Sequence, residues 1–118
     1  MHILKKDLLL IAEISANHNG KLKNALKLVD QAKKYGADLV KLQTFKPENM
    51  TLKTYKNRFV VKEGLWKNKS LYDLYEKGQT PYSWHKKIFN SAKKNRIGCF
   101  STPFHESDVD FLEKLKCP

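Results

Sequence analysis

Charged side chains stand inside two apolar segments of this sequence, where a strand would bury them. Lys41 interrupts the segment LVKLQ at residues 39–43, and Glu13 lies between two apolar neighbours in LLLIAEI at residues 8–14. A buried charge is costly unless it faces water or an opposite charge. Lys41 therefore faces a water-filled cavity that could receive an anion, or packs its stem on the strand and extends its ammonium group to solvent. Glu13 could be its structural ion-pair partner on the adjacent strand.

Two hydroxyl side chains, Ser101 and Thr102, follow a third short apolar segment at residues 97–100. Backbone amides and hydroxyls at such a position can converge on a phosphate oxygen. Plain capping of the next helix is the alternative. Pro103 would fix the turn, and we expect Phe104 to belong to the core.

Polar side chains also follow the other two apolar segments. Asn17 and His18 lie in the loop SANHNG at residues 15–20, and Gln43 and Thr44 end the second segment. A lone histidine is more often a structural residue than a ligand. Gln43 and Thr44 could line a pocket, although hydrogen bonds of a turn explain them as well. No pair among the four histidines has metal-site spacing, so this segment alone predicts no metal centre.

The elements that would carry these residues alternate between strand-like and helix-like patterns. An amphipathic helix begins near residue 22, and Gly36 is placed to end it. Ser70 begins a short helix with Asp73 as its capping-box partner, and Thr80 with Pro81 opens another helix. In order, the sequence predicts a strand at 8–14, a helix at 22–35, a strand at 39–43, a long polar loop at 44–69, helices from 70 and at 80–95, a strand at 97–100 and a final helix around 109–115.

Three successive strand and helix units predict an α/β fold with a parallel sheet and right-handed crossovers. The pattern alone does not decide between a closed barrel and an open sheet. A dinucleotide-binding fold would carry a glycine-rich turn after its first strand, and residues 15–20 contain one glycine. The polar residues instead follow each strand, where (β/α)8 enzymes place their active sites.

The chain carries a net charge of +11, from 23 Lys and Arg against 12 Asp and Glu. Such an excess would suit a nucleic-acid partner. The lysines, however, are scattered in pairs on the solvent side of helix-like segments, which favours a solvated basic surface and no nucleic acid. The two cysteines lack CxxC spacing, and no apolar stretch reaches the roughly 20 residues that a membrane crossing needs. We expect a soluble cytoplasmic protein that binds no membrane.

Aromatic side chains are frequent in the second half of the long loop and the helices after it. On a basic surface they could stack on bases, but their spacing fits helix packing better. We expect them to form core and to cover a loop of a length that usually serves function. They are Trp66, Tyr72, Tyr75, Tyr82 and Trp84.

Three motifs together resemble the sialic acid synthase family. They are IAEISANHNG at residues 11–20, GADLVKLQTF at residues 36–45 and FSTPF at residues 100–104. The segment at residues 59–85, with GLWKNKSLYDLYEKGQTPYSWH inside it, is more similar to the pseudaminic acid synthase branch than to the N-acetylneuraminate branch. The resemblance extends over the chain from Leu8 onward.

The resemblance implies a transferase built on a TIM-type (β/α)8 barrel. Such an enzyme condenses phosphoenolpyruvate with a 2,4-diacetamido-trideoxy hexose to give pseudaminic acid, a nonulosonic acid, and phosphate. The family also implies a divalent metal ion, Mn²⁺ or Mg²⁺, a C-terminal antifreeze-like domain and a homodimer. Residues 1–118 correspond to about three βα units, the N-terminal portion of the barrel. We therefore expect the remaining barrel, the metal ligands and the C-terminal domain to be absent, and the isolated chain to be inactive.

The resemblance also implies roles for individual residues. Lys41 would contact phosphoenolpyruvate, and Glu13 would face the sugar aldehyde as a hydrogen-bond acceptor or proton-transfer group. Both are predicted to be catalytic. The predicted substrate-binding residues are Asn17, His18, Gln43, Thr44, Ser101 and Thr102.

Alternatives remain at this point. The chain could belong to an N-acetylneuraminate or legionaminate synthase, or it could be an inactive truncated remnant or a basic nucleic-acid-binding module. The synthase interpretation requires the amine of Lys41 and the hydroxyl of Thr102 to lie on the same face of the sheet.

Overall fold

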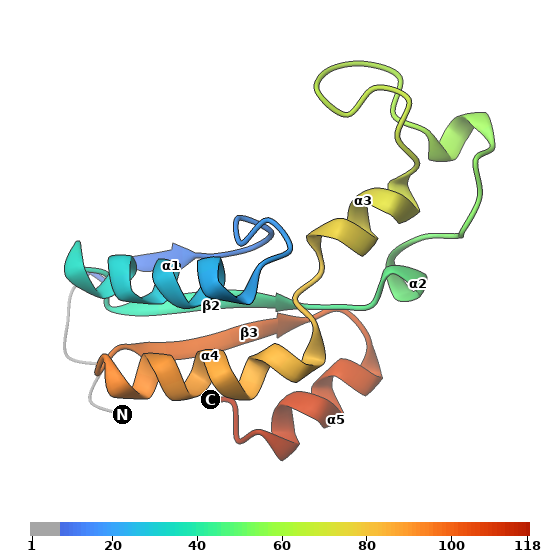
Figure 1. The fold of residues 1–118 in the computed structure, drawn as a ribbon. Coiled ribbons are helices and arrows are strands. Elements are labelled where there is room, and N and C mark those ends of the chain that lie inside the picture. The colour runs from blue at the N-terminus through green and yellow to red at the C-terminus, as the bar shows by residue number, and fades with distance from the viewer. Residues whose placement is uncertain (1–7) are drawn as a thin grey trace.

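The computed structural model describes residues 8–118, which form a three-stranded parallel sheet with helices packed on one face (Figure 1). The strand order in the sheet is β1-β2-β3, so each strand lies beside the next one in the sequence. The predicted parallel α/β arrangement is confirmed. The elements are β1 (Ile11–Glu13), α1 (Leu22–Lys34), β2 (Leu39–Thr44), α2 (Pro47–Met50), η2 (Asn57–Phe59), α3 (Leu71–Gly78), α4 (Tyr82–Lys94), β3 (Gly98–Pro103) and α5 (Glu106–Lys114).

Helix boundaries follow the signals in the sequence. The hydroxyl of Ser70 accepts a hydrogen bond from the backbone N–H of Asp73 at 3.1 Å, so the predicted cap of α3 is confirmed. Gly36 follows α1 with a φ of +90°, a conformation that side chains other than glycine rarely adopt. Short connections thus join α1 to β2 and α4 to β3.

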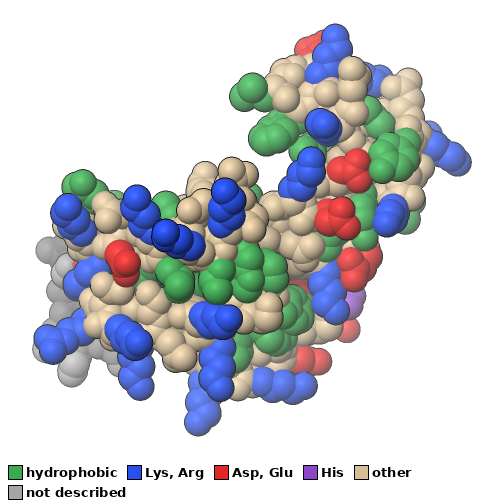
Figure 2. Space-filling model, in the orientation of Figure 1, with side chains coloured by type: hydrophobic (Ala, Val, Ile, Leu, Met, Phe, Trp, Pro, Cys, Tyr) green, Lys and Arg blue, Asp and Glu red, His purple; other side chains and the backbone are tan. Residues whose placement is uncertain are grey.

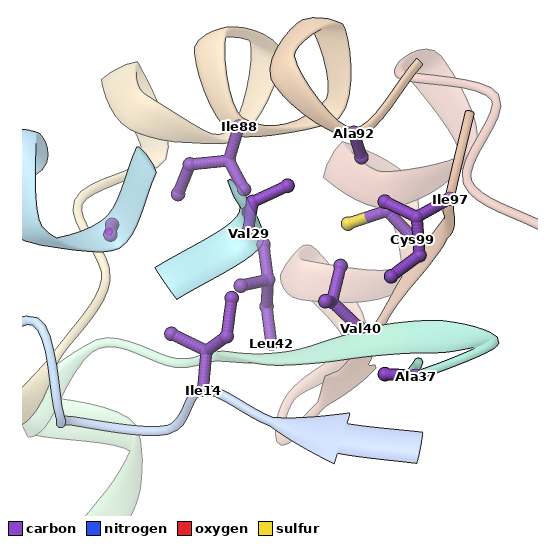
Figure 3. Close-up of a cluster of buried hydrophobic side chains, with 10 residues drawn as sticks. Ile14, Val29, Ala37, Val40, Leu42, Ile88, Ala92, Ile97 and Cys99 are labelled. Atoms are coloured by element: carbon purple, nitrogen blue, oxygen red, sulfur yellow. The ribbon is translucent and has the colours of Figure 1, made fainter. Parts of the chain in front are cut away.

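The hydrophobic core lies between the sheet and the paired helices α1 and α4 (Figure 3). Val40 and Leu42 of β2 point into it, because alternate residues of a strand share a face. Val29 of α1 and Ile88 of α4 meet them from the helix side. Each of these four side chains is fully buried, and removing this apolar surface from water stabilises the fold.

The opposite face of the sheet is open among the described residues. We expected the apolar residues 8–14 to form a buried strand, and this is wrong for β1. Leu8, Leu10 and Ile11 are 80%, 55% and 43% exposed. The strand contains only Ile11–Glu13 and lies at an edge of the sheet, where no described helix covers its second face.

The polar segment between β2 and α3 extends away from the sheet with α2, η2 and α3 (Figure 1). Two aromatic residues that we expected in the core are largely outside it: Trp66 is 59% exposed and Phe104 is 43% exposed. Trp66 belongs to this segment, which extends away from the sheet. Tyr72, Tyr75 and Trp84 are partly buried, as their helical spacing predicts.

Lysine and arginine side chains are spread over the visible face of the molecule and do not gather into one patch (Figure 2). This distribution agrees with the expected solvated basic surface. Within residues 8–118, no helix has both the length and the apolar character needed to cross a membrane.

Candidate active site at the carboxyl ends of the strands

The open face of the sheet gathers four of the predicted site residues. In β2, Lys41 and Gln43 alternate with the buried Val40, Leu42 and Thr44, so they face away from the helices. Glu13 lies opposite Lys41 in the β1 and β2 register.

Thr102 completes this group from β3. It lies opposite Gln43 in the register of β2 with β3, and it alternates with the buried Ser101. Lys41 and Thr102 therefore lie on the same face, as the synthase interpretation requires. We call Glu13, Lys41, Gln43 and Thr102 the open-face site.

An ion pair joins the two charged members of the open-face site. Lys41 Nζ lies 2.7 Å from Glu13 Oε2, and their side chains are 33% and 35% exposed. Glu13 Oε1 also accepts a hydrogen bond from the backbone N–H of Ser15 at 3.2 Å. Water screens a pair this exposed, so it adds little stability but fixes both charged groups at the strand ends. The ammonium group retains donors for an arriving anion, because lysine has three N–H groups.

His18 holds the loop that follows β1. It is fully buried, its Nδ1 accepts from the backbone N–H of Gly20 at 3.1 Å, and its Nε2 lies 3.3 Å from the hydroxyl of Thr80. Nε2 therefore carries the ring proton and donates it to Thr80. Burial lowers the pKa of His18 below its ordinary value, so the ring stays neutral. The structure thus places His18 on the helix side and gives it a role in holding the loop.

Asn17 lies in the same loop and points toward the backbone rather than toward the open-face site. Its side-chain amide donates to the carbonyl oxygen of Ile14 at 3.0 Å. Ser15 and Asn19 have positive φ angles of 44° and 50°, and these bonds stabilise that unusual turn. The predicted substrate contacts of Asn17 and His18 stay predictions.

Thr44 and Ser101 lie on the helix-covered face, away from Lys41. The Thr44 hydroxyl lies 2.6 Å from the Ser101 hydroxyl and 2.8 Å from Nε2 of His85. His85 Nδ1 lies 3.1 Å from the carbonyl oxygen of Pro81. The structure does not bring Thr44 and Ser101 together with the open-face site, because each is one residue out of phase with it along its strand. Their predicted substrate contacts are untested, and their observed partners are structural.

His85 is fully buried in α4 and was not predicted as a functional residue from the sequence. The spacing in the sequence could have indicated its burial. Ile88 and Ala92 lie three and seven residues after His85, so all three share the inward face of one helix. Burial is the main cause that lowers the pKa of His85, which keeps its ring neutral.

A buried carboxylate beside β3 was also not predicted from the sequence. Asp108 of α5 accepts hydrogen bonds from the hydroxyl of Tyr82 and, at 3.2 Å, from the backbone N–H of Phe104. Burial and the Asp108 carboxylate raise the pKa of Tyr82 to about 12. This contact fixes the turn after β3 to the first turn of α4.

The described residues do not assemble a metal centre. Within residues 8–118, no three His, Cys, Asp or Glu side chains come together in a group that could hold a metal ion. Of the four histidines, His18 and His85 are engaged inside the fold, and His2 lies outside the described residues.

The fold and the open-face site together define a class: a protein of parallel βα units with a cation, a carboxylate and a hydroxyl on one face of neighbouring strands. The profile of the NeuB family matches residues 28–118, which is most of the chain. The chain belongs to the NeuB family.

Curated relatives of the chain include pseudaminic and legionaminic acid synthases. Pseudaminic acid synthase of Campylobacter jejuni serotype O:2 is 50% identical over 110 residues, which cover 93% of this chain and 32% of that protein. Pseudaminic acid synthase of Helicobacter pylori is 43% identical over 109 residues, covering 92% of this chain and 32% of that protein. N,N'-diacetyllegionaminic acid synthase of Campylobacter jejuni is 38% identical over 111 residues, which cover 93% of this chain and 33% of that protein. The chain spans about a third of the length of these relatives.

Solved structures share the fold. The N-acetylneuraminic acid synthetase of Leptospira borgpetersenii superposes with a TM-score of 0.76 at 21% identity, covering 95% of this chain and 34% of that chain. The spore coat polysaccharide biosynthesis protein of Bacillus subtilis superposes with a TM-score of 0.63 at 28% identity. The superposition covers 95% of this chain and 28% of that chain.

Proposed function

We propose that this chain acts as part of a synthase that condenses phosphoenolpyruvate with a 2,4-diacetamido-trideoxy hexose to give pseudaminic acid and phosphate. The observation that carries the proposal is the placement of Lys41 and Thr102 on one open face of two adjacent strands. The identity of 50% to a pseudaminic acid synthase supports the choice of sugar. The chain spans about a third of that relative, and the family resemblance implies a barrel, a C-terminal domain and a homodimer. We propose that the chain works as the N-terminal βα units of such an assembly.

The open-face site suits the charges of the substrates. Phosphoenolpyruvate carries a carboxylate and a phosphate, and the Lys41 ammonium group can donate charge-assisted hydrogen bonds to either. The hydroxyl of Thr102 can donate to a phosphate oxygen from the adjacent strand. As the phosphoenolpyruvate C3 attacks the sugar aldehyde, water adds at C2 and the C2–O bond to phosphate breaks. Glu13 would accept a hydrogen bond from the sugar or transfer a proton.

The family resemblance implies a divalent metal ion, and the described residues do not fit one. They gather no cluster of three candidate ligands, and Glu13 is already engaged by Lys41 and by the Ser15 N–H. We therefore assign no step of the reaction to a metal ion held by residues 8–118.

A second candidate function is legionaminic acid synthesis. Its basis is the 38% identity to the Campylobacter jejuni legionaminic acid synthase over nearly the same part of the chain. The two reactions share the phosphoenolpyruvate chemistry and differ in the configuration of the amino sugar. Substrate choice therefore separates them.

A chimera tests the proposal. Residues 8–118 would replace the matching third of the Campylobacter jejuni pseudaminic acid synthase, and phosphate release from phosphoenolpyruvate would be measured with each candidate sugar. We expect turnover with the pseudaminic acid precursor and much less with the legionaminic acid precursor or N-acetylmannosamine. The 118-residue chain alone should release no phosphate. A folded chimera that is inactive with every sugar would reject the synthase proposal, and a preference for the legionaminic acid precursor would favour the second candidate.

A further inference from the structure

A buried chain of three polar side chains runs behind the open-face site. Pro81 contributes a carbonyl oxygen, which can only accept, so Nδ1 of His85 must donate to it. The neutral ring then accepts at Nε2 from the hydroxyl of Thr44. Thr44 has used its only proton and must accept from the hydroxyl of Ser101. The direction of every hydrogen bond in the chain is thereby fixed.

This chain of hydrogen bonds joins the two strands, β2 and β3, that carry Gln43 and Thr102 of the open-face site. Thr44 directly follows Gln43, and Ser101 directly precedes Thr102, with alternate side chains on opposite faces of the sheet. A link between Thr44 and Ser101 on the helix side therefore sets the spacing of β2 and β3 at the strand ends on the open side. His85 anchors this link to the first turn of α4.

We infer that His85, acting through Thr44 and Ser101, is a positioning residue for phosphoenolpyruvate binding at Lys41 and Thr102. The inference rests on the proposed function. Binding one ligand from two strands requires a fixed separation of the two donor groups, and a small displacement weakens both contacts. Apolar side chains would fill the same volume but would not fix direction and distance, whereas a completed hydrogen-bond chain does. Among the described residues, every buried polar side-chain N or O atom has a hydrogen-bond partner, so no member of the hydrogen-bond chain lacks one.

The test is a titration of the 15N-labelled 118-residue chain with phosphoenolpyruvate, followed through the backbone amide signals of Lys41 and Thr102. Thr44→Val keeps the side-chain shape and removes the hydroxyl, and Ser101→Ala removes the terminal donor. We expect each to raise the dissociation constant about five- to tenfold, the equivalent of one hydrogen bond. Thr44→Ser should restore it.

A matched control separates positioning from general destabilisation. Val40 is fully buried on the same face of β2 but lies outside the hydrogen-bond chain, so Val40→Ala should lower thermal stability without changing the dissociation constant. An unchanged affinity in folded Thr44→Val or Ser101→Ala would overturn the inference and leave the proposed function intact, provided that Lys41→Met abolishes binding. A wild-type chain that shows no saturable shift would overturn the proposed site itself, and the inference with it.

Discussion

The two faces of the sheet are built from alternating residues of the same strands, yet they do different work. The helix-covered face holds fully buried apolar side chains and polar groups with every partner inside the fold. The open face holds an ion pair and partly exposed polar groups at the strand ends. Stability is therefore concentrated on one face and ligand chemistry on the other. Substitutions at neighbouring residues of one strand, which point to opposite faces, test this division.

The largest effect on stability is expected at Leu42. Its side chain is fully buried between the sheet and the helices, so Leu42→Ala should lower the free energy of unfolding by about 2–5 kcal/mol. The neighbouring open-face substitution Gln43→Ala should cost roughly 0.5 kcal/mol or less. Urea denaturation of both variants measures the difference. Equal losses in the free energy of unfolding would show that stability is not concentrated on the helix-covered face.

A smaller loss is expected at Asp108. Asp108→Asn keeps the volume but cannot accept at both oxygens, so the backbone N–H of Phe104 or the hydroxyl of Tyr82 loses its acceptor. We expect a loss of about 1–3 kcal/mol, the cost of an unsatisfied buried donor. Asp110→Asn, an exposed change on the same helix, is the control and should be nearly neutral in the same denaturation experiment.

The buried histidines predict a pH dependence. Burial lowers the pKa of His18 and His85 below 6.5, while the unfolded chain keeps the ordinary value. The unfolded state therefore binds more protons in acid. Their contribution to stability is complete above pH 6.5 and is lost as the pH falls toward the lowered pKa values. Thermal melts across this range should show the loss, and His85→Gln should make it shallower; an unchanged slope would contradict the account.

A small effect on stability is expected at the ion pair. Glu13→Gln removes a partner of Lys41, but both side chains are about one-third exposed. We expect a change in the free energy of unfolding of about 1 kcal/mol or less. A larger loss in urea denaturation would mean that Glu13 serves the fold rather than the ligand site.

The sequence predicted the parallel α/β order and the cap of α3, and it offered the pairing of Glu13 with Lys41 as one alternative, which the structure shows. These features depend on local patterns and on neighbouring strands. It did not separate Thr44 and Ser101 from the open-face site, because the phase of a strand depends on which face the helices cover. His85 and Asp108 were missed for a related reason: the hydrogen bonds between His85 and Thr44 and between Tyr82 and Asp108 join residues 41 and 26 positions apart in the sequence.

The most direct measurement is the dependence of the chimeric synthase on Lys41. Lys41→Met keeps the length of the stem and removes the charge, so kcat/KM for phosphoenolpyruvate should fall by about 100-fold or more, whereas the fold should remain stable. Lys41→Arg keeps the charge and should retain part of the activity. A folded Lys41→Met chimera with undiminished kcat/KM for phosphoenolpyruvate would contradict the assignment of ligand chemistry to the open face.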